Sequence, residues 1–254
     1  MKVVILAGGL GTRITEESHM KPKPMIEIGG TPILVHIMNH YSKYGFNDFI
    51  ILAGYKSEHI FNYFANFYTN SSKNSIFNLE SGKREDLEVE TKNWSVQVID
   101  SGLNTQTGGR LLWAKDFVKG DFLLTYGDGL SDVDLNKLVD SHKLDKNIVT
   151  LTAVQPEARF GALEFGEKNN ILGFYEKPKG DGHWINGGFF CCKKDIFEYI
   201  RSDNEILERF PLESISELGR LGAYKHEGFW HPMDTLRDKN KLELLLKEDK
   251  APWV

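Results

Sequence analysis

The feature that most constrains the fold is a strand pattern that occurs twice near the N-terminus, with one helix pattern between its two copies. Residues 2–9 (KVVILAGG) are an apolar run that ends in glycines, and residues 47–55 (NDFIILAGY) are a second run of the same kind. Between them, residues 33–45 (ILVHIMNHYSKYG) place apolar side chains at helical spacing and stop at a glycine. Two buried strands joined by a helix are typical of a parallel sheet. The sequence therefore predicts an α/β fold.

The rest of the chain adds strands to this sheet, together with two departures from it. Apolar or alternating runs predict further strands at 94–102, 122–130, 148–156 and 184–192. Residues 57–68 and 235–248 have the pattern of helices, and residues 162–178 that of a hairpin. Residues 69–93 are polar and turn-rich, which indicates a small excursion from the core. We expect one domain, residues 1–254, with a mixed, mostly parallel central sheet.

Length, charge and cysteine content exclude several classes of protein. A chain of 254 residues fits one large α/β domain or two small ones, and its net charge of −5 argues against a nucleic-acid partner. No apolar run approaches the ~20 residues that cross a bilayer, and the N-terminus lacks a signal-peptide pattern, so we expect a cytoplasmic protein with no membrane partner. Cys191 and Cys192 are adjacent in an apolar run, which predicts reduced core residues.

A glycine-rich loop follows the first predicted strand, at the edge where open α/β sheets bind ligands. It matches neither common nucleotide fingerprint, because Ile14 stands where the dinucleotide motif has glycine, and Arg13 and Ile14 stand where a P-loop has Gly-Lys. Glycines let backbone N–H groups turn toward an anion, and the Arg13 guanidinium suits phosphate oxygens. The alternative is an ordinary glycine turn with a solvated arginine.

Two lysines behind this loop each precede a proline. Lys21 and Lys23 are therefore expected to leave the helical region, so that KPKP forms a stiff strip that holds an ammonium group in place. The alternative is a proline-rich surface linker with two solvated lysines. The short distance in sequence from Arg13 to Lys23 favours the first interpretation, a cationic site for phosphate groups.

These segments together resemble the sugar-1-phosphate nucleotidyltransferase family, whose signature is a G-x-G-T-R loop and a following lysine segment. The matching positions are Gly9, Gly11, Thr12 and Arg13, then Pro22, Lys23 and Pro24. Later segments follow in the family's order, namely TYGDGL, RFGALEF, YEKPKG, INGGFF and FWHPMDTLRD. The resemblance implies a Rossmann-like mixed sheet flanked by helices, of the nucleotide-diphospho-sugar transferase type. It also implies a reaction in which a nucleoside triphosphate and a sugar 1-phosphate give a nucleoside diphosphate-sugar and pyrophosphate.

Two features, TGGRL at 107–111 and the excursion at 69–93, resemble the members that use CTP and glucose 1-phosphate and form CDP-glucose. The resemblance implies that Lys23 contacts the α-phosphate and that Arg13 holds the departing pyrophosphate. It also implies nucleotide contacts from Leu6, Ala7, Gly8, Gly9, Gly11, Thr12, Thr107, Gly108, Gly109 and Arg110. Family members assemble, so a homo-oligomer such as a hexamer is expected. Residues 69–93 are then either an oligomer contact or a mobile loop.

The expected reaction calls for a magnesium ion between the phosphates, held by hard oxygen ligands. Asp128 follows a buried strand and is the first candidate, although an Asp-Gly pair is also a common turn signal. The helix pattern after Asp128 argues against a tight hairpin there. Asp234 is either a second ligand, as the family's spacing from Trp230 implies, or the cap of the last helix. We expect Asp234 to bind metal and Thr235 to cap.

The sugar site is assigned by resemblance to residues in the second half of the chain. Glu176 would accept hydrogen bonds from sugar hydroxyls, and Lys177 would pair with the sugar phosphate. Gly161, Asn186 and Gly187 would let the backbone approach the sugar ring. Taken without the resemblance, Glu176 and Lys177 are equally a solvated pair at a strand end.

Base selection is assigned to Arg110, because a guanidinium offers only donors. Cytosine presents acceptors at O2 and N3, whereas uracil carries a proton on N3, so Arg110 is expected to favour CTP. Gly108 and Gly109 would allow main-chain contact with the base. Arg110 as a general phosphate or surface residue is the alternative. Other functions left open are a transferase that uses UTP or dTTP, a nucleotide-sugar sensor without turnover and, more distantly, an oxidoreductase.

Overall fold

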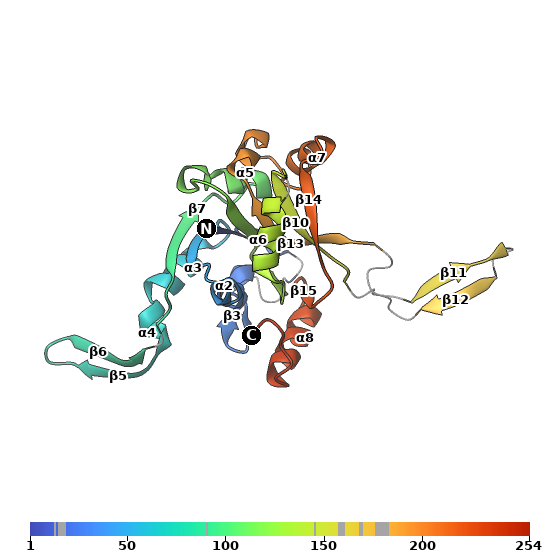
Figure 1. The fold of residues 1–254 in the computed structure, drawn as a ribbon. Coiled ribbons are helices and arrows are strands. Elements are labelled where there is room, and N and C mark those ends of the chain that lie inside the picture. Colours follow the sequence, from blue (N-terminus) through green and yellow to red (C-terminus); the bar gives the residue numbers. More distant parts are fainter. Residues whose placement is uncertain are drawn as a thin grey trace.

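The computed structural model describes residues 1–12, 14, 19–89, 91–144, 146–156, 161–167, 170–175 and 183–254. Its centre is a seven-stranded sheet (Figure 1). From edge to edge the strands are β14 (Leu221–His226), β10 (Val149–Val154), β13 (Ile185–Cys192), β8 (Phe122–Tyr126), β1 (Lys2–Ala7), β4 (Asp48–Ala53) and β7 (Ser95–Asp100).

Strand directions confirm a mixed, mostly parallel sheet. β1 runs parallel to both β4 and β8, and the pairs β4–β7 and β10–β14 are also parallel. β13 alone in this sheet is antiparallel to its neighbours, β8 and β10. The predicted strand–helix–strand unit is confirmed, because α2 (Ile33–Lys43) joins β1 to its neighbour β4. Parallel neighbours align their carboxyl ends, so the loops after β1, β4 and β8 meet at one edge.

Two hydrophobic clusters cover the two faces of the sheet. In β1, Val3 and Ile5 point into one cluster and Val4 and Leu6 into the other, as the alternation of side chains along a strand requires. The first cluster includes side chains from α2, α3 (Ser57–Ala65), α6 (Leu135–Leu144) and α8 (Leu236–Lys247). The second includes side chains from α5 (Thr107–Leu112), η5 (Lys194–Tyr199) and α7 (Phe210–Glu217), with η2 (Lys115–Phe117) following α5. Each fully buried aliphatic side chain stabilises the fold by about 1.5–3 kcal/mol.

A short strand pair brings distant segments of the chain to the edge where β1 and β8 end. β9 (Gly129–Ser131) pairs antiparallel with β15 (Trp230–Pro232), and the Met233 N–H donates to the Asp128 carbonyl over 2.8 Å. The helix expected directly after Asp128 therefore begins only at Leu135, because β9 comes first. A second small pair, β2 (Glu27–Ile28) with β3 (Thr31–Pro32), precedes α2.

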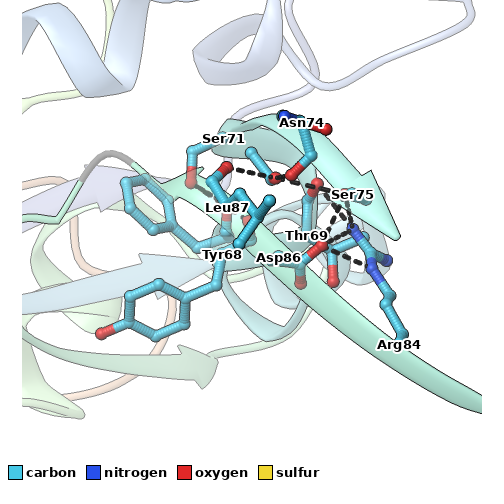
Figure 2. A network of polar contacts seen from close by, with 10 residues as sticks. Tyr68, Thr69, Ser71, Asn74, Ser75, Arg84, Asp86 and Leu87 are labelled. Atoms are coloured by element: carbon cyan, nitrogen blue, oxygen red, sulfur yellow. Dashed lines mark hydrogen bonds and ion pairs between the residues drawn. The ribbon is translucent and has the colours of Figure 1, made fainter. Parts of the chain in front are cut away.

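The polar excursion is a β-hairpin preceded by a short helix. α4 (Phe67–Ser71) leads into β5 (Ser72–Asn78), which pairs with β6 (Lys83–Val89) away from the central sheet (Figure 1). Figure 2 shows the polar network at its base, where Asp86 Oδ1 accepts hydrogen bonds from Ser75 Oγ and Arg84 Nε, both over 2.6 Å. The pKa of Asp86 is lowered by the Ser75 hydrogen bond and by Arg84. These contacts join β5 to β6, and Arg84 Nη2 ties the hairpin to α4 by donating to the Thr69 carbonyl over 3.2 Å.

The remaining expectations concern the second hairpin and the cysteines. β11 (Ala162–Phe165) and β12 (Ile171–Tyr175) pair antiparallel as predicted. Cys191 and Cys192 are fully buried free thiols in β13, which confirms them as core residues, and burial raises the pKa of Cys191 to about 12. Among the described residues, no helix has both the length and the hydropathy needed to span a bilayer.

Candidate active site

A cavity of about 330 Å³ opens beyond the carboxyl ends of β1 and β8. Most of the expected nucleotide, catalytic and metal residues lie on its wall: Leu6, Ala7, Gly8, Gly9, Gly11, Thr12, Lys23, Thr107, Arg110, Asp128 and Asp234. Ile14, the residue that departs from both nucleotide-binding motifs, is fully buried. Its N–H donates to the Gly11 carbonyl over 3.1 Å. It therefore anchors the glycine loop in the core beside the cavity.

Three charged groups from distant parts of the chain meet in this cavity. Lys23 Nζ donates to Asp128 Oδ2 over 2.6 Å and to Asp234 Oδ1 over 2.7 Å. Burial lowers the pKa of Lys23, but attraction and hydrogen bonds from Asp128 and Asp234 outweigh it, so the pKa is raised above its usual value. Lys23 is therefore a fixed cation with two carboxylates around it, and the group carries a net charge of about −1.

The strip that presents Lys23 differs in one respect from the sequence expectation. Lys23 begins η1 (Lys23–Met25), a single 3-10 turn, instead of continuing an extended strip. The Met25 N–H donates to the Pro22 carbonyl over 2.8 Å, and the Ile26 N–H donates to the Lys23 carbonyl over 3.1 Å. These two turn bonds offset the restriction that Pro24 places on the residue before it. The turn also buries Lys23, whose exposed fraction is 9%.

The start of α8 shows which of Asp234 and Thr235 caps the helix, a role that the sequence alone allowed for either residue. Thr235 is the N-cap, its hydroxyl accepts from the Asp238 N–H, and Asp238 completes the capping box. The Asp238 carboxylate accepts from the Thr235 N–H over 2.8 Å. Thr235 is thus confirmed as the cap, and the Asp234 carboxylate contacts Lys23.

The two carboxylates fit a magnesium ion, because Asp128 and Asp234 both reach a single point, now taken by the Lys23 ammonium nitrogen. In the part of the chain that the structure describes, no three His, Cys, Asp or Glu side chains converge to hold a metal alone. Magnesium commonly takes one or two carboxylates together with substrate phosphates and water. The donor set therefore suits an ion that arrives with phosphate ligands.

Arg110 links the end of β4 to the segment after β7 and lies against Gly8 of the glycine loop. Its Nη1 donates to the Ala53 carbonyl and to Ser101 Oγ, both over 2.7 Å, and Nη2 donates to the Thr105 carbonyl over 2.8 Å. The guanidinium lies so close to Gly8 that a Cβ built there would be 1.9 Å from Nη1. Gly8 therefore cannot carry a side chain while Arg110 holds this position.

The structure shows why positions 108 and 109 require glycine, and the sequence did not suggest this reason. Both N–H groups donate to the Glu205 carbonyl, over 2.9 and 3.0 Å. A Cβ on Gly109 would stand 2.2 Å from the Asp203 carbonyl oxygen, and one on Gly108 would be 2.9 Å from that of Glu205. These glycines let α5 pack on the backbone of residues 203–207, and neither is among the described residues that line the cavity.

The expected sugar residues lie partly beside the cavity and partly outside the described chain. Asn186 Nδ2 is 3.4 Å from the hydroxyl of Tyr126, which lines the cavity, and the Gly187 carbonyl accepts from Trp230 Nε1 over 2.6 Å. Gly161, Asn186 and Gly187 do not themselves line the described cavity. Arg13, Glu176 and Lys177 lie outside the described residues, so their roles stay predictions.

Sequence reasoning missed five residues of the cavity wall: Pro24, Thr105, Gln106, Tyr126 and Gly127. Each one is within two residues of a motif residue that was selected, so extending each motif by two positions finds them all. It also missed Glu208, which accepts from Thr107 Oγ1 over 2.7 Å and from the Tyr126 hydroxyl. No local pattern marks Glu208, because its partners are distant in the sequence.

A cavity beyond the carboxyl ends of mostly parallel strands places the chain in the class of α/β proteins that bind their ligand at this edge of the sheet. A sequence model of the family described as "Nucleotidyl transferase" matches residues 2–230. The chain therefore belongs to the nucleotidyl transferase family and is a nucleotidyltransferase.

The names of individual similar proteins are consistent with membership of this family. Glucose-1-phosphate cytidylyltransferase of Salmonella typhi is 48% identical over 255 residues, which cover 100% of this chain and 98% of that protein. A Bacillus subtilis protein named "Probable glucose-1-phosphate cytidylyltransferase" is 38% identical, with 100% and 99% covered. The solved structure of "UTP-bound UGPase from acinetobacter baumannii" has a TM-score of 0.71 at 18% identity, with 98% of this chain and 93% of that chain covered. At that identity the likeness supports the fold alone.

Proposed function

We propose that this protein transfers a cytidylyl group from CTP to glucose 1-phosphate, giving CDP-glucose and pyrophosphate. The observation that carries the proposal is the 48% identity over the whole chain to a protein named glucose-1-phosphate cytidylyltransferase. The meeting of Lys23, Asp128 and Asp234 in one cavity supports the chemistry, since a magnesium ion held by the two carboxylates would bring the net charge of the group to about +1, and two polyanionic substrates require positive charge.

In the proposed reaction, a phosphate oxygen of glucose 1-phosphate attacks the α-phosphorus of CTP. The new bond joins that oxygen to the α-phosphorus, while the bond from the α-phosphorus to the bridging oxygen breaks and pyrophosphate leaves with the electron pair. The chain's contribution is alignment and charge neutralisation, with no covalent intermediate. In this proposal Lys23 would donate to the α-phosphate oxygens as charge develops on them.

Asp128 and Asp234 are the residues that would hold a magnesium ion. When bound, the ion would supply Lewis-acid neutralisation of phosphate charge. The Lys23 ammonium has three N–H donors and uses two of them on Asp128 and Asp234, so the third can donate to a phosphate oxygen once the substrate binds. The short contacts of Lys23 with both acids keep it at the cavity until then.

The reaction is tested by measuring pyrophosphate release from CTP, UTP, dTTP and GTP with glucose 1-phosphate, with and without magnesium. We expect release with CTP that far exceeds release with the other three and that is abolished by EDTA. Turnover with UTP or dTTP in preference to CTP would contradict the cytidylyl assignment. Tight nucleotide binding with no release from any of the four would support a sensor instead.

The Asp234→Asn variant tests the second metal ligand. The helix start should survive, because Thr235 caps α8, but a neutral amide is a poorer ligand for a hard cation. We expect the magnesium concentration for half-maximal activity to rise by about tenfold or more. Asp140→Asn, on the exposed side of α6, is the matched control and should change nothing. Unchanged magnesium dependence and turnover in Asp234→Asn would remove Asp234 from the site.

The Arg110→Ala variant tests base selection. Three hydrogen bonds already engage Arg110, so at most two of its five N–H groups remain for a base. If these meet cytosine O2 and N3, their loss should lower the CTP-over-UTP ratio of kcat/KM by roughly tenfold to hundredfold. Arg110→Lys keeps the charge and loses the fork, and it serves as the control. A stability loss with an unchanged ratio would leave Arg110 as a structural link only.

Several further assignments stay predictions for this protein. Arg13 would hold pyrophosphate, and Glu176 and Lys177 would bind the sugar hydroxyls and the sugar phosphate. The hairpin at 69–93 would contact another copy of the chain in a homo-oligomer. Phe77 and Leu79 in this hairpin are 61% and 92% exposed, which is typical of apolar residues that another protein chain covers. A cytoplasmic location also stays a prediction.

A further inference from the structure

One side of the cavity is formed by Tyr126, whose hydroxyl belongs to a hydrogen-bond network that the proposed reaction does not use. Tyr126 is the last residue of β8, and its ring packs edge-on against Phe190 at 5.7 Å between centroids. Its hydroxyl donates to Glu208 Oε1, and Glu208 Oε2 accepts from Thr107 Oγ1 over 2.7 Å. The carboxylate of Glu208, an exposed residue outside the cavity lining, thus bridges the cavity residues Tyr126 and Thr107.

The position of Glu208 is fixed from both sides. The Leu207 N–H donates to Thr107 Oγ1 over 2.9 Å, so the threonine hydroxyl accepts from the backbone and donates to the carboxylate. The same segment is held to α5 through the Glu205 carbonyl, which accepts from Gly108 and Gly109. Glu208 is therefore oriented by a closely packed backbone as well as by its own side-chain contacts.

The network determines where the single phenol hydrogen of Tyr126 points. A carboxylate only accepts, so the Tyr126 hydroxyl must donate to Glu208 and cannot donate into the cavity at the same time. Burial, followed by the charge and hydrogen bond of Glu208, raises the pKa of Tyr126, so the phenol keeps its hydrogen. What remains for a ligand is lone-pair density on the phenol oxygen, which Asn186 Nδ2 approaches only to 3.4 Å.

We propose that Glu208 is a positioning residue that fixes the Tyr126 phenol oxygen as a hydrogen-bond acceptor for a hydroxyl group of a bound substrate. The proposal rests on the proposed function and deepens it. The hydroxyl belongs either to the ribose of the nucleotide or to the sugar of the sugar phosphate, because Tyr126 lies between Thr107 and Asn186. An acceptor at this place favours a hydroxyl over hydrogen, and it disfavours fluorine, which can only accept.

The test compares each parent substrate with its monodeoxy and deoxyfluoro analogues at every hydroxyl of the ribose and of the sugar. With the wild type, one position should show a loss in kcat/KM of about tenfold for both the deoxy and the fluoro analogue. In Tyr126→Phe this loss should fall to about twofold or less at that position and stay unchanged elsewhere. The position identified also decides between ribose and sugar as the source of the hydroxyl.

Glu208→Ala separates positioning from simple structural support. Without the carboxylate, the phenol hydrogen is free to turn into the cavity and donate to fluorine, so the penalty for the fluoro analogue should shrink more than that for the deoxy analogue. Glu208→Gln retains one acceptor oxygen and should give an intermediate ratio. Glu213→Ala, an exposed glutamate on the neighbouring α7, is the control and should match the wild type.

Two outcomes would overturn the proposal. One is a wild-type enzyme for which no analogue position responds to Tyr126→Phe. The other is a Glu208→Ala variant with lower thermal stability but an unchanged fluoro-to-deoxy ratio. The ratios are measured with whichever nucleotide the wild type turns over, or as binding affinities by calorimetry if it turns over none. If the enzyme turns over another nucleotide but not CTP, the proposed function is contradicted, and the Glu208 proposal is still tested by the analogue ratios.

Discussion

Replacement of Lys23 by methionine is expected to lower kcat by about 10²- to 10³-fold, the usual effect of removing one preorganised donor from a transition state. Methionine keeps much of the length of the side chain and its packing in η1, but it cannot donate to the α-phosphate. The measurement is steady-state pyrophosphate release with CTP at saturating magnesium. KM for glucose 1-phosphate should change much less, because Lys23 is assigned to the nucleotide.

The same variant has a second consequence that does not depend on turnover. Without the ammonium, Asp128 and Asp234 face each other uncompensated, and like charges held close together oppose folding. Lys23→Met should therefore have a lower Tm in EDTA than the wild type, and magnesium should raise its Tm by more. Thermal melts at several magnesium concentrations measure this directly.

Lys21→Met is the matched control for both effects. Lys21 also precedes a proline, but it forms an exposed ion pair with Glu27 at 2.5 Å and does not line the active-site cavity. Such surface pairs contribute about 0–1 kcal/mol, so both activity and magnesium response should stay close to wild type. Equal activity losses in the two variants, or a Lys23→Met protein indifferent to magnesium, would contradict the assignment.

The Gly109→Ala variant is expected to lose about 3 kcal/mol of unfolding free energy, at the upper end of the usual cost of overpacking. The new methyl group would meet the backbone of Asp203 at 2.2–2.4 Å, and a backbone cannot turn aside as a flexible side chain can. The segment that carries Glu205 would have to separate from α5, which breaks the bonds from the Gly108 and Gly109 N–H groups. Urea denaturation of the purified variant measures the loss.

Gly120→Ala is the control for this substitution, because nothing lies within 4 Å of a Cβ built at Gly120. Its free energy of unfolding should stay within about 0.5 kcal/mol of the wild type. If Gly109→Ala is as stable as Gly120→Ala, the close packing of α5 on residues 203–205 does not stabilise the fold. A stable Gly109→Ala protein with a raised KM for CTP would instead favour main-chain contact with the base.

The strands and helices were largely predictable, and so was the choice of candidate residues. β1, α2 and β4 follow from apolar periodicity and glycine stops, because burial of one stripe or one face leaves a regular trace in local sequence. Thr235 as the cap of α8 follows from the spacing to Asp238. The 3-10 turn at Lys23 did not follow, because two hydrogen bonds to neighbouring residues overcame the proline rule that predicted an extended strip.

By itself, the sequence determined which residues are chemically suited to a polyphosphate site: a glycine loop, a lysine held between prolines and two aspartates at element ends. Only the tertiary structure decided that they meet, since Lys23 contacts partners 105 and 211 residues away. That meeting depends on sheet order and on the β9–β15 pair, which no local pattern records. The same holds for residues 203–208, whose contacts with α5 and Tyr126 arise because packing joins segments that are remote in the chain.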